Sequence, residues 1–245
     1  MALTKVNNPI KELQTGIPRG APFDIYTARS KGVSSALAWQ YVHSGWLHRL
    51  ERGVFMFPND NLQRDPSLKF LAKRLPGFHV GGKTALAWRG IRHYLAPREH
   101  LILWGEEYGK LPEWFTSRFP SRYVAKRLFS KELPSGYACQ PLPESPDGPM
   151  VSTPERALLE MLSEVGLQQG IEEARLIMES VHSLRPEVLE KLLKNCLRIK
   201  VQRLCVQWAQ ELNLDWSPVA RAAVTLGKSY WCTRLKDGTT LTLKP

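Results

Sequence analysis

Residues 77–84 carry the motif with the clearest chemical meaning: their sequence GFHVGGKT matches the phosphate-loop pattern G-x-x-x-x-G-K-[ST] at every fixed position. In a phosphate loop a buried strand ends at the first glycine, so that backbone N–H groups of the following turn and helix converge on phosphate oxygens. Residues 66–76, PSLKFLAKRLP, instead have leucines at helical spacing and end in proline. The strand-like residues 78–80 lie inside the interval that must be loop. We therefore expect a strand, then a glycine turn, then a helix over residues 83–89. Because the strand takes the place of the phosphate-binding loop, we expect no nucleotide to bind here.

The side chains that hydrolytic enzymes need are not grouped in the sequence. A nuclease would require an acidic residue and an E-x-K pair to hold Mg²⁺, but Glu132 and Glu190 are each followed two positions later by a non-basic residue. None of the histidines pairs with a serine or cysteine nucleophile, and we expect His79 and His93 to be structural. The cysteines form no C-x-x-C pair and lack metal-ligand spacing with a histidine. The sequence thus predicts no catalytic residues, no metal and no cofactor.

The charge of the chain points to a polyanionic partner. Lys and Arg number 34 against 23 Asp and Glu, which gives a formal charge of +11 in 245 residues. Residues 1–60 carry 7 basic and 4 acidic side chains, residues 61–145 carry 14 and 7, and residues 146–245 carry 13 and 12. A nucleic acid fits the first two segments better than the last. Since no apolar run is long enough for a membrane span or a secretory signal, we expect a soluble cytoplasmic protein.

The N-terminal sixty residues have the order of a winged helix-turn-helix. Residues 25–30 can form a short helix, Gly32 a turn, and Ser34 or Ser35 the cap of a second helix that ends near Gly45. Two apolar-rich runs, residues 47–50 and 54–57, then flank Glu-Arg-Gly in the form of a hairpin.

The second helix of this segment has one face suited to DNA. Helical periodicity places Val33, Ala38, Tyr41 and Val42 in the core and leaves Ser35, Ala36, Trp39, Gln40 and His43 outside. Gln can bond a base edge bidentately, and Ser, His and the Trp N–H can bond phosphates or bases. We expect the DNA contacts to come from Ser34, Ser35, Trp39, Gln40 and His43 in the major groove, with Arg49 and Arg52 of the hairpin on phosphates. The alternative is that Trp39 covers a neighbouring domain and that the arginines are solvated.

The rest of the chain reads as two further parts, which makes the whole an α+β protein. Residues 61–148 mix a helix at 67–75, the strand, turn and helix above, and strands at 100–104 and around 122–129. Their basic excess could extend a DNA footprint, bind another acidic partner or be solvated. Residues 149–245 begin with a hydroxyl-capped helix at Ser-Thr-Pro-Glu and continue with helices near 171–180, 187–196 and 201–212. A terminal hairpin, with strands at 229–235 and 239–243, closes around a Lys-Asp-Gly turn.

Three blocks together resemble a known family. SGWLHRLERGVF closes the helix-turn-helix, HVGGKTALAWRGIRHYL follows, and STPERALLEML comes third, within roughly residues 5–165. This order is similar to that of the AbiEi antitoxins of type IV toxin–antitoxin and phage abortive-infection operons. The resemblance implies a winged-helix domain that binds inverted repeats in the operon's own promoter. It also implies a C-terminal part that opposes a nucleotidyltransferase-like toxin without necessarily forming a stable complex, and a Gly-Gly segment that binds no nucleotide.

The resulting prediction is a DNA-binding antitoxin and transcriptional autorepressor that has no enzymatic activity. We expect a winged helix-turn-helix at residues 1–60, a mixed α/β module at 61–148 and a helical antitoxin part at 149–245. The chain would be a monomer in solution, and inverted repeats could be read by two monomers side by side. Two alternatives remain: a winged-helix regulator without a toxin partner, and an ATP- or Mg²⁺-dependent enzyme acting on DNA.

Overall fold

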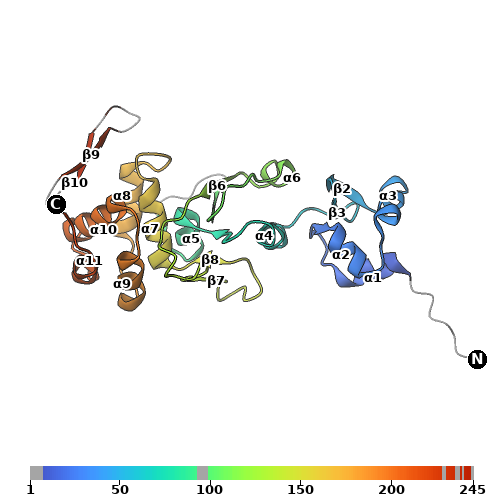
Figure 1. The fold of residues 1–245 in the computed structure, drawn as a ribbon, viewed down its shortest axis with the longest axis horizontal. Helices are drawn as coiled ribbons and strands as arrows, with labels where there is room; N and C mark the ends of the chain where they lie inside the picture. Colours follow the sequence, from blue (N-terminus) through green and yellow to red (C-terminus); the bar gives the residue numbers. More distant parts are fainter. Residues whose placement is uncertain (1–7, 93–98, 228–229, 235–237, 239, 244–245) are drawn as a thin grey trace, which may run out of the picture. The chain divides into compact units, whose positions relative to one another are not determined.

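The computed structural model describes residues 8–92, 99–227, 230–234, 238 and 240–243. The chain forms two compact units, the first from residues 1–74 and 111–119 and the second from residues 75–110 and 120–245 (Figure 1). Helices and strands occur in both units, so the predicted α+β class is confirmed. The first unit extends past the predicted boundary at residue 60, since it includes residues 61–74 and 111–119. No unit boundary falls at residue 148, because elements from both sides of that residue share one sheet.

The first unit begins with a run of short elements whose ends are fixed by local hydrogen bonds. Asp24 caps its second helix by accepting from the Thr27 N–H at 2.8 Å, and Ser34 caps the third by accepting from the Leu37 N–H at 3.2 Å. Gly53, with φ +76°, makes the hairpin turn that follows. The elements are α1 (Pro9–Gly16), β1 (Phe23–Asp24), α2 (Ile25–Ser30), α3 (Ser35–His43), β2 (His48–Glu51), β3 (Val54–Met56), α4 (Arg64–Ala72) and α6 (Glu113–Thr116).

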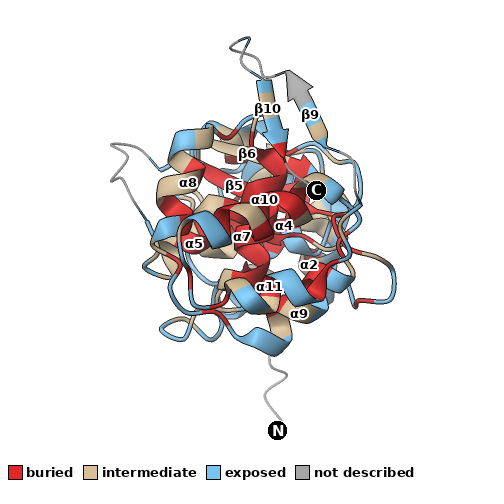
Figure 2. Ribbon diagram, turned by 90° about the vertical axis from the view of Figure 1, so that its left-hand side faces the viewer, coloured by how far each residue is buried: buried red, intermediate tan, exposed pale blue. Residues whose placement is uncertain are grey.

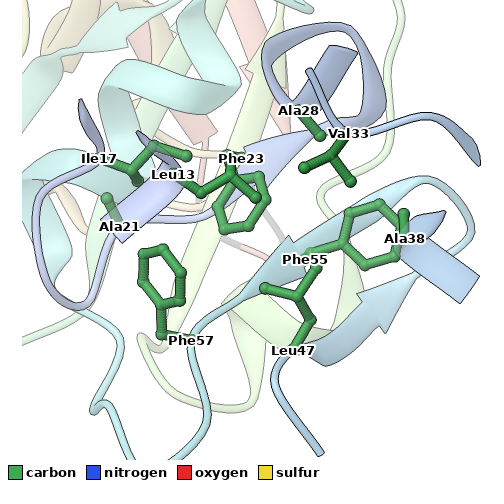
Figure 3. Packing of buried hydrophobic residues seen from close by; sticks show 10 residues of the cluster. All are labelled: Leu13, Ile17, Ala21, Phe23, Ala28, Val33, Ala38, Leu47, Phe55 and Phe57. Carbon is green, nitrogen blue, oxygen red and sulfur yellow. The ribbon is translucent and has the colours of Figure 1, made fainter. Parts of the chain in front are cut away.

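A small aromatic and aliphatic core holds these N-terminal elements together (Figure 3). The strands form an antiparallel sheet in the order β1-β3-β2, with a bulge between Arg49 and Glu51. The Phe23 ring lies 6.1 Å from that of Phe55 and 5.6 Å from that of Phe57, measured between centroids. Helix α1 was not expected from the residue pattern, yet its Leu13 is fully buried in this core. The cluster consists of Leu13, Ile17, Ala21, Phe23, Ala28, Val33, Ala38, Leu47, Phe55 and Phe57.

A five-stranded mixed sheet organises the second unit. Its order is β6-β5-β4-β8-β7, with β4 antiparallel to β5 and parallel to β8. The predicted strand around residues 122–129 ends at Ala125. The elements of this sheet and its connecting helix are β4 (His79–Val80), α5 (Gly82–Trp88), β5 (Leu101–Gly105), β6 (Ser121–Ala125), β7 (Cys139–Gln140) and β8 (Val151–Ser152).

Helix α7 (Pro154–Glu164) is the centre of this unit, and residues 155–164 of it are all buried (Figure 2). The predicted hydroxyl cap at its start does not form, because Thr153 Oγ1 donates to the Glu155 carboxylate at 2.6 Å instead of accepting from the helix. In the described residues that follow, the structure has four helices and an antiparallel hairpin, of which α11 has no counterpart in the sequence prediction. They are α8 (Ile171–Glu179), α9 (Pro186–Lys194), α10 (Ile199–Glu211), α11 (Ser217–Ala223), β9 (Trp231–Arg234) and β10 (Thr240–Leu243). The predicted Lys236–Asp237 part of the hairpin turn lies outside the described residues.

Among the residues described, none of the helices is long and apolar enough to cross a membrane.

Candidate nucleic-acid interface

Helix α3 has a buried face and an exposed face, divided as the sequence predicts. Val33, just before the helix, is fully buried and Ala38 is 1% exposed, while Leu37, Tyr41 and Val42 pack partly buried against the core. The opposite face is exposed to solvent and includes Trp39, whose exposed fraction is 61%. The residues on this outer face are Ser35, Ala36, Trp39, Gln40 and His43. Their contact with DNA stays a prediction.

Several polar atoms on the outer face already have partners within the protein. Ser34 Oγ caps the helix, and Ser35 Oγ accepts from Arg29 Nη2 at 2.7 Å. His43 Nδ1 lies 2.9 Å from the Trp39 carbonyl, where it acts as the donor, and the two rings lie 3.7 Å apart between centroids with their planes tilted by 35°. On this outer face, the Gln40 amide, the Trp39 indole N–H and His43 Nε2 bond to no residue that the structure describes. These are the atoms that a ligand of this face would meet.

The hairpin that follows α3 carries two arginines whose charges no acidic side chain of the described residues neutralises. Arg49 and Arg52 are exposed, and neither forms an ion pair with any described residue. Arg49 Nε reaches only the Glu51 carbonyl, at 3.4 Å. The Glu51 carboxylate, which is the one acid of the hairpin, is paired with Arg74. The hairpin therefore has a net positive charge available to phosphates.

Three further residues belong to this surface but were missed from the sequence. Arg29 lies on α2, and its bond to Ser35 brings a guanidinium beside the N-terminus of α3. Tyr26 is 73% exposed on the same helix, and Trp46 is 52% exposed just beyond α3, where its backbone N–H donates to the Tyr41 carbonyl at 2.8 Å. In the sequence, the six-residue spacing from Arg29 to Ser35 was the one available sign of a contact between these two side chains. The exposure of Tyr26 and Trp46 could not be predicted, because the exposure of an aromatic ring cannot be read from its neighbours in sequence.

The segment that matches a phosphate loop has the predicted strand, glycine turn and helix, and its anion position is filled from within. The Gly82 N–H, at the start of α5, donates to Glu160 Oε2 at 3.0 Å. Lys83 Nζ is paired with Glu173 at 2.9 Å. The groups that would hold phosphate in a nucleotide-binding protein thus bind two carboxylates of this chain.

Glu160 is fully buried and collects donors from four places. His79 Nε2 lies 2.8 Å and Arg156 Nε 2.8 Å from its Oε1, and Ser152 Oγ donates to its Oε2 at 2.9 Å. His79 Nδ1 lies 2.7 Å from the Gly77 carbonyl, so that each nitrogen of the ring faces an oxygen acceptor. Burial raises the pKa of Glu160, but the charges and hydrogen bonds of His79 and Arg156 outweigh it and lower the pKa to about 2. The expectation that His79 is structural is confirmed, whereas His93 lies outside the described residues.

Two other acids of α7 also bind basic side chains, those of Glu164 from the middle segment and that of Glu155 from the C-terminal segment. Glu164 pairs with Arg122 at 2.6 Å and Lys126 at 2.7 Å. Glu155 accepts from the backbone N–H and the guanidinium of Arg185. Burial raises the pKa of Glu155, but these bonds lower it to about 2. Several basic residues that could have served DNA or a second partner therefore have internal roles, while Arg98 lies outside the described residues.

Within the ranges that the structure describes, no group of three or more His, Cys, Asp or Glu side chains could hold a metal ion. The cysteines are free thiols, and burial raises the pKa of Cys139 and Cys196 to about 11, so that both are neutral at physiological pH.

Comparisons with known proteins cover both units. Residues 6–97 match the family described as "Transcriptional regulator, AbiEi antitoxin N-terminal domain", and residues 98–233 match "Transcriptional regulator, AbiEi antitoxin, Type IV TA system". No curated protein matches the sequence significantly. The crystal structure of the RV2827C protein from Mycobacterium tuberculosis is similar over 95% of this chain and 90% of that chain, with a TM-score of 0.57. At 13% identity this likeness concerns the fold alone.

Proposed function

The chain belongs to the AbiEi antitoxin family of type IV toxin–antitoxin transcriptional regulators, and from this premise we propose that it binds double-stranded DNA in its own promoter through α3 and the β2–β3 hairpin. In this proposal α2, α3 and the hairpin act as a winged helix-turn-helix. Helix α3 enters the major groove, and the hairpin lies against the neighbouring backbone or minor groove.

The observation that carries the proposal is the combination of free polar atoms on α3 with unpaired cations around it. The outer face presents the Gln40 amide, the Trp39 indole and His43 Nε2, none of which bonds to any described residue. Arg29 lies at the start of this helix, Arg49 and Arg52 lie on the hairpin that follows it, and none of the three forms an ion pair within the described chain. Unpaired arginines attract phosphates and release counterions, while an amide and an indole can meet base edges.

We further propose that binding at inverted repeats represses the operon. A monomer has one α3, so a repeat with two-fold symmetry is read by two monomers. Their half-sites are then separated by about one helical turn of DNA, roughly 34–36 Å, or by a multiple of it.

DNase I footprinting of the chain's upstream region, together with a promoter–reporter assay, tests this part. We expect protection of two symmetric half-sites and reduced reporter expression. The double variant Gln40→Ala with Arg52→Ala is the control that should lose both effects while remaining folded. Uniform or absent protection by the parent protein would contradict the proposal.

The antitoxin role is proposed on family membership. We propose that the part of the chain after residue 148 opposes a nucleotidyltransferase-like toxin and that no stable complex between the two proteins is required. Growth rescue on co-expression with the toxin encoded beside this chain, combined with size-exclusion chromatography of the mixture, tests it. Rescue with separate elution supports the proposal, whereas failure of the intact chain to rescue growth would refute it.

A further inference from the structure

We infer that α3 reads adenine–thymine base pairs, with Gln40 on adenine and with Ala36 and Trp39 against thymine methyl groups. The inference rests on the proposed DNA binding and adds to it the class of base pair that the protein selects.

Helix α3 lacks the side chains that read guanine and cytosine. Its sequence SALAWQYVH contains no Arg or Lys, which are the usual bidentate partners of guanine O6 and N7. It also contains no Asp or Glu, which would accept from the cytosine amino group. The nearest guanidinium, that of Arg29, is bonded to Ser35 Oγ at the first residue of the helix. Direct readout by α3 therefore depends on the side chains that remain.

Gln40 is the one amide side chain of α3, and an amide can bond a base edge bidentately through separate donor and acceptor atoms. Its carbonyl on the main chain accepts from the Ser44 hydroxyl at 2.8 Å, which fixes the backbone at the end of the helix. Its side-chain amide is exposed and bonds to no described residue. In the major groove, adenine presents an N7 acceptor and an N6 donor, which match the amide N–H and C=O. Adenine is thus the base that Gln40 fits.

Ala36 and Trp39 give the same face an apolar surface. Ala36 is exposed one turn before Gln40, at the i−4 position on the same side of the helix. Trp39 is 61% exposed, and its ring contacts the tilted His43 ring with 3.7 Å between the centroids. The thymine C5-methyl is the apolar group that a base edge offers in the major groove. An apolar surface beside an adenine-reading amide therefore fits a stretch of A·T pairs.

Selection of full-length protein against a pool of random-sequence duplexes tests this inference, and it does not require the operator sequence to be known. We expect the enriched half-site to hold A·T pairs at the positions that α3 contacts. Enrichment of a motif whose required pairs are G·C would overturn the inference and leave the proposed DNA recognition intact. Enrichment of no motif would overturn both.

Base analogues in the enriched duplex then identify which atoms of the bases the protein contacts. Replacing the contacted adenine with 7-deazaadenine, which removes only N7, should weaken binding about tenfold, since one bidentate pair contributes about that much. Replacing the contacted thymines with uracil, which removes only the methyl, should also weaken it, whereas 7-deazaguanine should leave it unchanged. Sensitivity to 7-deazaguanine in place of 7-deazaadenine would overturn the inference.

Two glutamine variants assign the effect to Gln40. Gln40→Ala should bind the adenine and 7-deazaadenine duplexes equally well. Gln14→Ala, which changes an exposed glutamine on α1, is the matched control and should retain the full discrimination. If Gln40→Ala discriminated as well as the parent, adenine readout by Gln40 would be refuted.

Discussion

On the outer face of α3, the residues at its two ends serve the helix itself, which leaves the middle of the face for a ligand. Ser34 accepts from an N–H of the first turn, and His43 and Ser44 bond to carbonyls of the last turn. The side chains of Gln40 and Trp39 have no such role. Substitution of these two residues should therefore change binding without unfolding the helix.

Gln40→Ala tests the residue that we expect to read bases. The variant should lose both affinity for the promoter duplex and preference over unrelated DNA, because a bidentate contact contributes about 1–3 kcal/mol of discrimination. Circular dichroism should show an unchanged fold. Unaltered affinity and preference would show that Gln40 does not face a base.

Arg52→Ala tests the hairpin by a different signature. A phosphate contact carries no sequence information, so specific and nonspecific affinity should fall together, and the slope of log affinity against log salt should decrease by about one. Arg221→Ala, which removes an exposed arginine from α11, is the control and should leave the slope as it is. Loss of preference with an unchanged salt slope would instead assign Arg52 to a base edge.

At the scale of elements, α7 joins two segments that are far apart in sequence. Glu160 on α7 binds His79 of β4, which lies 81 residues away, together with the first N–H of α5. The sheet and its helices thus share one buried ionic cluster. Such a cluster is sensitive to loss of a single member, since the remaining charges stay buried without compensation.

Glu160→Gln should destabilise the fold by about 3 kcal/mol or more at neutral pH, because its amide cannot replace a carboxylate for His79 and Arg156. The matched control is Glu190→Gln, in an exposed pair with Lys194, which should have little effect. Urea denaturation of the three proteins measures this difference. Equal stability of parent and Glu160→Gln would contradict the role given to the cluster.

The pH dependence of stability follows from the same carboxylates. The pKa values of Glu160 and Glu155 are lowered from 4.5 to about 2 in the folded state, so the stability they contribute is fully present above pH 4.5 and is lost as the pH falls towards 2. Denaturation midpoints measured across this range should fall for the parent and fall less steeply for Glu160→Gln. Parallel curves for the two proteins would argue against the shifted pKa of Glu160.

The sequence was informative where local chemistry sets an element. The cap at Ser34, the turn at Gly53 and helical periodicity allowed α2, α3 and the hairpin to be predicted, along with the faces of α3, whereas the Asp24 cap of α2 was found only in the structure. Helices α1, α6 and α11 could not be predicted, because they are short and lack a side-chain cap. They depend instead on packing against distant residues, as α1 does through Leu13 in the core. The ion pairs of the buried acids of α7 could not be predicted either, since most of their partners are remote in sequence. In the candidate interface, Arg29 and Trp46 were missed because the contact of α2 with α3 and the exposure of an aromatic ring cannot be read from the sequence.

At the scale of the whole molecule, the second unit cannot be divided near residue 148 without loss of structure. A chain ending there would lack β8 and α7, and His79 and Gly82 would lose Glu160 as a partner. Substitutions in the full-length chain are therefore the appropriate way to separate the two proposed roles.

The double variant Gln40→Ala with Arg52→Ala, made in the full-length chain, should fail to repress the promoter but still rescue growth from the toxin expressed under a separate promoter. Both substitutions lie on α3 and the hairpin, which are outside the part assigned to toxin opposition. Reporter expression and growth are read in the same cells. Loss of rescue by this folded variant would show that DNA binding and toxin opposition use one surface.

The most direct test of the central claim is fluorescence anisotropy of the purified full-length protein on a labelled duplex from its own upstream region and on a scrambled duplex, at two salt concentrations. If α3 and the hairpin read the promoter, we expect tight binding to the upstream duplex, a preference of about a hundredfold or more over the scramble, and a steep loss of affinity at the higher salt concentration. Weak and equal binding to both duplexes would contradict it, because the positive charge would then be generic and α3 would read no sequence.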